Sequence, residues 1–183
     1  MLGNYLPYIA LAILMIIGVV SDLKSNRIPN LLIITGIILA SIFHSVLFGL
    51  QGMVTLLLGA IAGLLLLLPF YLVKAMGAGD VKFMSMVGAF LGYQVTALAV
   101  GLTLIVGGVI AISLIVYKQQ AGLTFNRYRK IFVTTLYSRK PFYIPPQGNE
   151  FAGTKFPYAL AIALGTLWAC YLRVFPILEE LML

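Results

Sequence analysis

Long uncharged runs, separated by short polar segments, dominate the pattern of hydrophobic and polar positions along this chain. Residues 1–21, 28–73 and 83–117 carry no charged side chain. A helix needs about 20 residues to cross the hydrocarbon core of a bilayer, so each of the two longer runs has room for two crossings. Glycine-containing turns at residues 48–52 and 92–94 are the natural breaks in these runs.

We therefore predict an all-α, polytopic membrane protein with six transmembrane helices in a single membrane-embedded domain, residues 1–183. The polar segment at residues 118–156 repeats apolar residues at helical spacing, and we expect a cytoplasmic surface helix there, between spans five and six. The fourth span is short, so we expect the segment before it, with Asp80, to dip below the membrane surface. The six spans are expected at about residues 3–21, 30–48, 53–73, 82–92, 95–117 and 157–175.

The composition agrees with a membrane protein. Of the 183 residues, 62% are hydrophobic and 9% are charged, and the mean hydropathy is +1.07. Soluble domains are roughly 45–50% apolar and 25% charged, so a soluble enzyme and a nucleic-acid reader are excluded. The net charge of +7 comes from Lys and Arg residues that lie between apolar runs, and anionic membrane lipid is the expected partner.

The distribution of basic residues predicts the orientation in the membrane. Eleven of the twelve Lys and Arg residues fall in the segments after spans one, three and five. The positive-inside rule makes these segments cytoplasmic, so both termini are expected on the outer side. The first span lacks the positive charge with which a removable signal peptide begins, so we expect it to stay in the protein.

Two aspartates are the candidates for chemistry. The chain has five acidic residues, and Glu150, Glu179 and Glu180 fall in a loop or in the C-terminal tail. Asp22 follows the first span and Asp80 precedes the fourth, so both are expected at the same cytoplasmic depth, facing each other across the bundle. A charged aspartate at the centre of a span costs about 2.5–3.5 kcal/mol, so a carboxylate near membrane depth indicates function.

A carboxylate pair can activate water for hydrolysis, because the ionised member takes a proton from water while the protonated member donates to the scissile carbonyl. Gly77 and Gly79 let the backbone bend beside Asp80 and let an extended peptide approach it. His44 is the only histidine and Cys170 the only cysteine, so serine, cysteine and zinc chemistry lack partners. No cofactor or metal is expected.

Each aspartate taken alone also has a structural interpretation. Asp22 could be an interfacial charge beside Lys24, and Asp80 could cap a helix beginning near Val81. Two other functions also remain open. The same carboxylates could relay protons in a small proton-coupled transporter or channel, or the chain could be a non-catalytic membrane subunit of a secretion assembly. The lack of an evident inverted repeat and the position of the aspartates near one face argue against a transporter.

Residues 21–30 and 77–82 resemble the type IV prepilin peptidases, the GxGD class of intramembrane aspartyl proteases. The segment at residues 155–161 and the six spans also fit, so the resemblance covers nearly the whole chain. The GxGD pattern becomes specific when it is combined with an aspartate followed by an Ile-Pro-Asn turn. The matching residues are Asp22, Ile28, Pro29 and Asn30 in the first segment, and Gly77, Ala78, Gly79, Asp80 and Lys82 in the second.

The resemblance implies that Asp22 and Asp80 are the catalytic pair of an endopeptidase in the bacterial cytoplasmic membrane. The implied substrate is a pilin precursor with a basic leader and an apolar helix, cut after a glycine at the cytoplasmic face, and the pilus assembly machinery is a further expected partner. The chain resembles the short form that serves tight-adherence (Flp-type) pili, although archaeal preflagellin peptidases share the aspartate pair. Larger members carry an extra cytoplasmic domain associated with N-methylation, and with about 21 residues before Asp22 we expect no methyltransferase activity.

Overall fold

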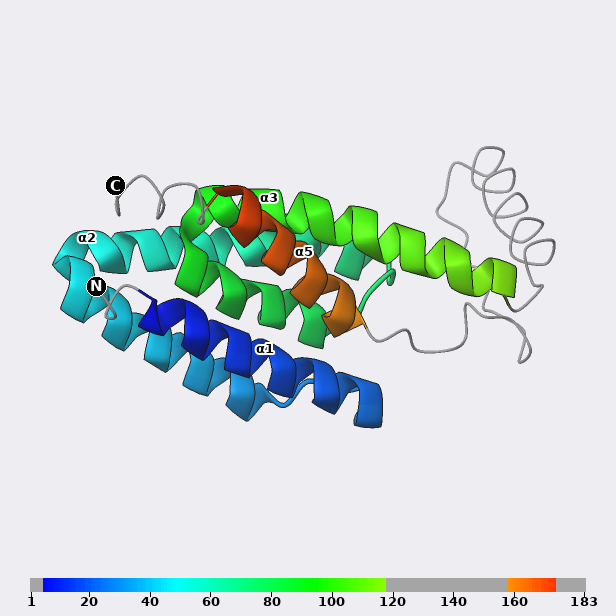
Figure 1. The fold of residues 1–183 in the computed structure, drawn as a ribbon, viewed down its shortest axis with the longest axis horizontal. Coiled ribbons are helices and arrows are strands. Elements are labelled where there is room, and N and C mark those ends of the chain that lie inside the picture. Colours follow the sequence, from blue (N-terminus) through cyan, green and yellow to red (C-terminus); the bar gives the residue numbers. More distant parts are fainter. Residues whose placement is uncertain (1–4, 118–157, 174–183) are drawn as a thin grey trace. The chain divides into compact units, whose positions relative to one another are not determined.

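In a computed structural model of the protein, residues 5–117 and 158–173 are described, and they form four helices (Figure 1). The all-α prediction is confirmed for this part of the chain. The expected surface helix within residues 118–156 lies outside the described residues. The helices are α1 (Leu6–Ser25), α2 (Asn30–Leu72), α3 (Ala78–Tyr117) and α5 (Tyr158–Arg173).

Three of the described helices are long and apolar enough to cross a membrane. They are α1, α2 and the part of α3 at Ala78–Leu114. The fourth, α5, is apolar but has 16 residues, which is slightly less than a full crossing needs. These lengths and compositions indicate a membrane protein.

The expectation of six separate spans is not supported, because the described residues hold four helices. The spans expected at 30–48 and 53–73 belong to one element, α2, and those expected at 82–92 and 95–117 belong to α3. A single glycine interrupts each element, Gly49 with φ 56° and ψ −139° and Gly92 with φ 74° and ψ 168°. Glycine adopts positive φ readily, so one residue makes each break and no separate loop follows it.

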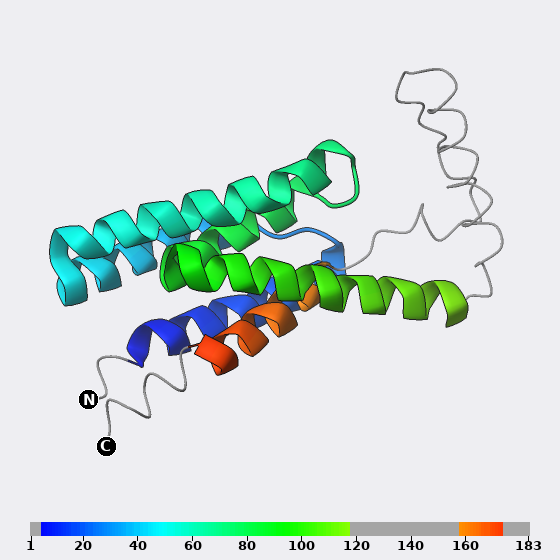
Figure 2. The same ribbon diagram turned by 90° about the horizontal axis from the view of Figure 1, so that it is seen from above.

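The two long elements fold back on themselves, as Figures 1 and 2 show. A straight helix with the 43 residues of α2 would be about 65 Å long, roughly twice the hydrocarbon thickness of a bilayer. The contacts show the reversal directly, because a Cβ at Gly52 would strike the backbone carbonyl of His44, eight residues earlier. Eight residues along a straight helix span about 12 Å, so the chain must turn between them.

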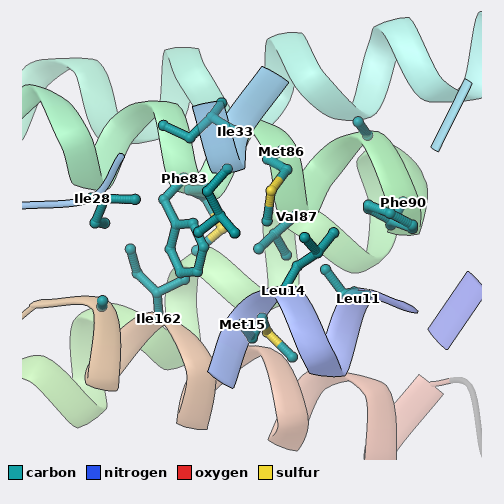
Figure 3. Packing of buried hydrophobic residues seen from close by; sticks show 14 of the residues in the cluster. Leu11, Leu14, Met15, Ile28, Ile33, Phe83, Met86, Val87, Phe90 and Ile162 are labelled. Carbon is teal, nitrogen blue, oxygen red and sulfur yellow. The ribbon is translucent and has the colours of Figure 1, made fainter. Parts of the chain in front are cut away.

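The core surrounds the arm of α3 that precedes Gly92. Figure 3 shows side chains of this arm, Phe83 and Met86 among them, packed between residues of α1, α2 and α5. Glycines bring the helices close together, since a Cβ at Gly59 or Gly63 would strike the backbone of this arm at Gly88 or at residue 84. The fully or nearly buried apolar residues of the arm are Val81, Phe83, Met84, Met86, Val87, Ala89 and Phe90.

The chain divides into two compact units, residues 1–107 with 157–183 and residues 108–156. The site described below lies in the first unit.

The position of the site depends on the end of α1, which the sequence places at residue 21 and which the structure places at Ser25. Asn26 ends the helix in the left-handed conformation, and its N–H donates to the Asp22 carbonyl oxygen at 2.7 Å. Asp22 is therefore inside the last turn of α1 and not beyond its end.

Candidate active site

Asp22 is a buried carboxylate, with 6% of its surface exposed. Its Oδ2 accepts a hydrogen bond from the backbone N–H of Ala159 at 3.2 Å. Ala159 is in the first turn of α5, where backbone N–H groups have no partner within the helix and the helix dipole attracts negative charge. The amino end of α5 is therefore directed at the carboxylate of α1.

Asp80 lies in the first turn of α3 and is partly buried. Its Oδ2 accepts a hydrogen bond from the backbone N–H of Gly77 at 3.0 Å, and its own N–H donates to the Gly77 carbonyl at 3.2 Å. A carboxylate that reaches back from the third helical residue to the N-cap amide forms half of a capping box. Asp80 therefore does cap a helix, but this helix begins at Ala78 and not near Val81.

The two carboxylates come from segments that meet, Asp22 from the end of α1 and Asp80 from the start of α3. Each has one oxygen bonded to a backbone amide at a helix amino end.

The connection between α1 and α2 supports this site from one side. The Ser21 hydroxyl donates to the Arg27 carbonyl at 3.0 Å, and the Ser25 hydroxyl donates to the same carbonyl at 3.3 Å. Pro29 is extended and directly precedes α2. These contacts hold the turn between the two helices, in which Ile28 is buried.

The same connection touches the start of α3. Ile28 lies beside Gly79, where an added Cβ would be 3.7 Å from the isoleucine Cβ. Lys82 Nζ donates to Asn30 Oδ1 at 3.3 Å, and both side chains are exposed. Ala78 is the first residue of α3 and is exposed. The segments that carry the resemblance, residues 21–30 and 77–82, are therefore in contact.

His44 and Cys170 lie away from this pair. His44 is 8% exposed, and its Nε2 lies 3.2 Å from the Phe90 carbonyl, near the bend of α3. Cys170 is on the last turn of α5, about eleven residues from the Ala159 amide. Within residues 5–117 and 158–173, no group of three or more His, Cys, Asp or Glu side chains is placed to hold a metal ion.

Two features of the candidate site were missed by sequence reasoning. The segment at residues 155–161 was identified only as part of the resemblance, and neither the Ala159 amide nor the Tyr158 side chain was assigned a role. A backbone donor has no residue-type signature, so only the start of a helix after Pro157 could have indicated it. The phenol of Tyr158 lies near enough to Asp80 for an electrostatic interaction.

In a comparison with protein families, the type IV leader peptidase family matches residues 9–112, more than half of the chain. The chain belongs to this family. Searches of curated proteins and of solved structures found no significant match. As a member of this family, the protein is a peptidase whose general substrate is a pilin precursor. The matched region includes Asp22 and Asp80 but ends before α5.

Proposed function

We propose that this leader peptidase is an intramembrane aspartyl endopeptidase in which Asp22 and Asp80 activate water to cut a Flp-like pilin precursor. One observation carries the proposal. The described residues contain two acidic side chains, and the segments that carry them, 58 positions apart in the chain, meet at the ends of three helices. Carboxylates that share a desolvated location titrate as a coupled pair, which supplies one acid and one base.

The reaction follows from that pair. The ionised carboxylate takes a proton from a water, and the resulting hydroxide forms a bond to the carbonyl carbon of the scissile peptide. The protonated carboxyl donates its proton to the carbonyl oxygen, giving a neutral tetrahedral diol. Collapse of the diol breaks the C–N bond: the carboxyl that took a proton from water gives it to the leaving nitrogen, one diol hydroxyl gives its proton to the other carboxylate, and the pair again holds one proton. The amides of Gly77 and Ala159 hold one oxygen of each carboxylate throughout.

The topology that supports this reaction is a bundle with six membrane crossings, in which the bends at Gly49 and Gly92 divide α2 and α3. Both termini are proposed to lie outside and the aspartates at the cytoplasmic face of the bacterial inner membrane. Lys24, Arg27 and Lys82 are exposed and lie within five residues of one aspartate or the other, which agrees with a cytoplasmic location.

The leader of the precursor and the segments around the site are both basic, so they repel each other. Recruitment of the substrate therefore needs a partner besides the enzyme. We propose that anionic lipid neutralises both, while the apolar helix of the precursor docks from the side and the pilus assembly machinery receives the product. Cleavage in liposomes should therefore fall as the anionic lipid fraction is lowered. Unchanged cleavage in neutral liposomes would exclude this role of the lipid.

The central experiment is cleavage of a Flp-type precursor by the purified protein in liposomes, followed by mass determination of the new N-terminus. We expect cleavage directly after a glycine, without an added methyl group. A proton-coupled transporter would instead move protons in vesicles that contain no precursor. Absence of cleavage by a folded protein, or a product that does not begin after glycine, would contradict the proposal.

A further inference from the structure

We infer that Tyr158 is a positioning residue of this site, and that its ring, seated on the backbone of α3 at Gly107, fixes the amino end of α5 so that the Ala159 N–H meets Asp22. The inference rests on the proposed function, because it gives Asp22 a catalytic role. It adds a residue outside the segments at residues 21–30 and 77–82 and outside the family match.

The backbone of Tyr158 is part of the hydrogen bond to Asp22. The peptide group that donates from Ala159 is formed by the carbonyl carbon of Tyr158 and the nitrogen of Ala159, so any movement of Tyr158 moves the donor. The N···O distance of 3.2 Å is at the long end of the range for such bonds. A shift of a few tenths of an ångström away from α1 would therefore break the contact.

The side chain of Tyr158 fixes that position against α3. A Cβ built on Gly107 would lie 2.7 Å from the hydroxyl oxygen, 2.9 Å from Cζ and 3.0 Å from Cε2 of Tyr158. Gly107 is buried, and its missing side chain is the space that the phenol end of the ring occupies. Any side chain at this position must displace the ring.

Close packing further along α5 limits how the helix can respond. A Cβ at Gly165 would lie 2.5 Å from the backbone nitrogen of Thr103 and 2.7 Å from its Cα. Gly165 is two helical turns after Tyr158, and Thr103 is about one turn before Gly107. α5 thus contacts α3 at Thr103 through Gly165 and at Gly107 through the Tyr158 ring, and it contacts Asp22 through Ala159.

Tyr158 acts on Asp22 through the peptide group that it shares with Ala159. Displacement of this residue therefore changes the surroundings of the Asp22 carboxylate without altering its side chain. Small misplacements of groups in an active site lower the turnover rate more than they lower substrate affinity.

The chain offers a matched control for the test. Gly107→Ala and Gly101→Ala make the same change in the same helix, and both gain the same helix propensity. A Cβ at Gly101 meets nothing within 4 Å, whereas a Cβ at Gly107 meets the Tyr158 ring. The full-length enzyme in liposomes, with a Flp-type precursor as the probe, gives kcat and KM for both variants and for Tyr158→Phe and Tyr158→Ala.

We expect Gly107→Ala and Tyr158→Ala to lower kcat by about 10-fold or more while KM stays within about twofold. Gly101→Ala should match the wild type, and Tyr158→Phe, which keeps the ring, should restore most of the kcat lost in Tyr158→Ala. In the Tyr158→Ala background, Gly107→Ala should have no further effect, because the ring that it displaces is absent. Thermal unfolding in detergent shows whether each variant is folded.

Three results would overturn the inference: a Gly107→Ala enzyme with the kcat of Gly101→Ala, additive losses in the double variant, or Tyr158→Phe as impaired as Tyr158→Ala. If Gly107→Ala fails to fold, the comparison of Tyr158→Phe with Tyr158→Ala decides. Failure of the proposed function is separate, because it appears as cleavage by Asp22→Asn. Inactive Asp22→Asn together with fully active Gly107→Ala contradicts only the role of Tyr158.

Discussion

The backbone N–H of Ala159 donates a hydrogen bond to Asp22 Oδ2, joining residues that are 137 positions apart in the chain. This bond brings the amino end of α5 to the last turn of α1, where α1 ends at Asn26. It places a fixed donor beside one of the two carboxylates. The other carboxylate, that of Asp80, accepts a hydrogen bond from a different backbone amide, that of Gly77. Each acid is therefore held by its own backbone donor.

Replacing either carboxylate by its amide should abolish cleavage without unfolding the protein. In Asp22→Asn and Asp80→Asn the side-chain oxygen can still accept the hydrogen bond from Ala159 or Gly77, so stability should change by less than about 1.5 kcal/mol. General acid–base catalysis contributes about 10²–10⁴-fold, so each variant should lose at least that factor in kcat.

The control for this prediction is Glu179→Gln, which makes the same change in the C-terminal tail. Cleavage by Glu179→Gln should equal that of the wild type, measured by the mass of the product. Activity of purified Asp80→Asn near the wild-type value would remove Asp80 from the catalytic pair.

Gly77, the residue directly before α3, should matter for activity because it lies close to the Asp80 carboxylate. A Cβ at Gly77 would lie 3.3 Å from Asp80 Oδ2, whereas a Cβ at Gly79 would lie 3.7 Å from the nearest atom of Ile28. Gly77→Ala must therefore move the carboxylate slightly, and we expect a larger fall in kcat than for Gly79→Ala, on the order of 10-fold. Equal kcat values for the two variants would show that this contact does not set the Asp80 position.

Close backbone contact between α2 and α3 should make Gly59 sensitive to substitution. A Cβ at Gly59 would strike the carbonyl oxygen of Gly88, and a backbone atom cannot rotate away as a side chain does. We expect Gly59→Ala to be less stable than Gly101→Ala by about 1–3 kcal/mol, as for other overpacked cores. Thermal or denaturant unfolding in detergent measures the difference, and equal stabilities would mean that the helices separate at little cost.

His44 should contribute to stability and not to catalysis. Its Nε2 lies 3.2 Å from the Phe90 carbonyl, and position 44 is 14 residues into α2, about 21 Å along the helix from the end that contacts Lys82. His44→Leu should lower stability by about 0.5–1.5 kcal/mol through the lost hydrogen bond, with kcat unchanged. Loss of cleavage in folded His44→Leu would instead assign the histidine to the chemistry.

The two candidate acids could be identified from the sequence because they depend on residue type and local spacing. Asp22 and Asp80 stand out because carboxylates are costly in an apolar chain, and the uncharged runs identify the helical segments. The breaks were also expected near the right glycines, Gly49 and Gly92. Six separate helices are not supported in the described residues, because one glycine with positive φ reverses the chain within α2 and within α3, where the pattern suggested a longer turn.

The sequence by itself determined that the chain is helical and apolar and that two acidic residues lie near the ends of helices. The tertiary structure alone decided which backbone amides hold those acids, that Lys82 reaches Asn30, and that the Tyr158 ring occupies the space beside Gly107. Side-chain chemistry and helical periodicity are local properties. Contacts between residues far apart depend on how closely the helices approach, and small residues such as Gly59 and Gly165 set that distance only once their partners are in place.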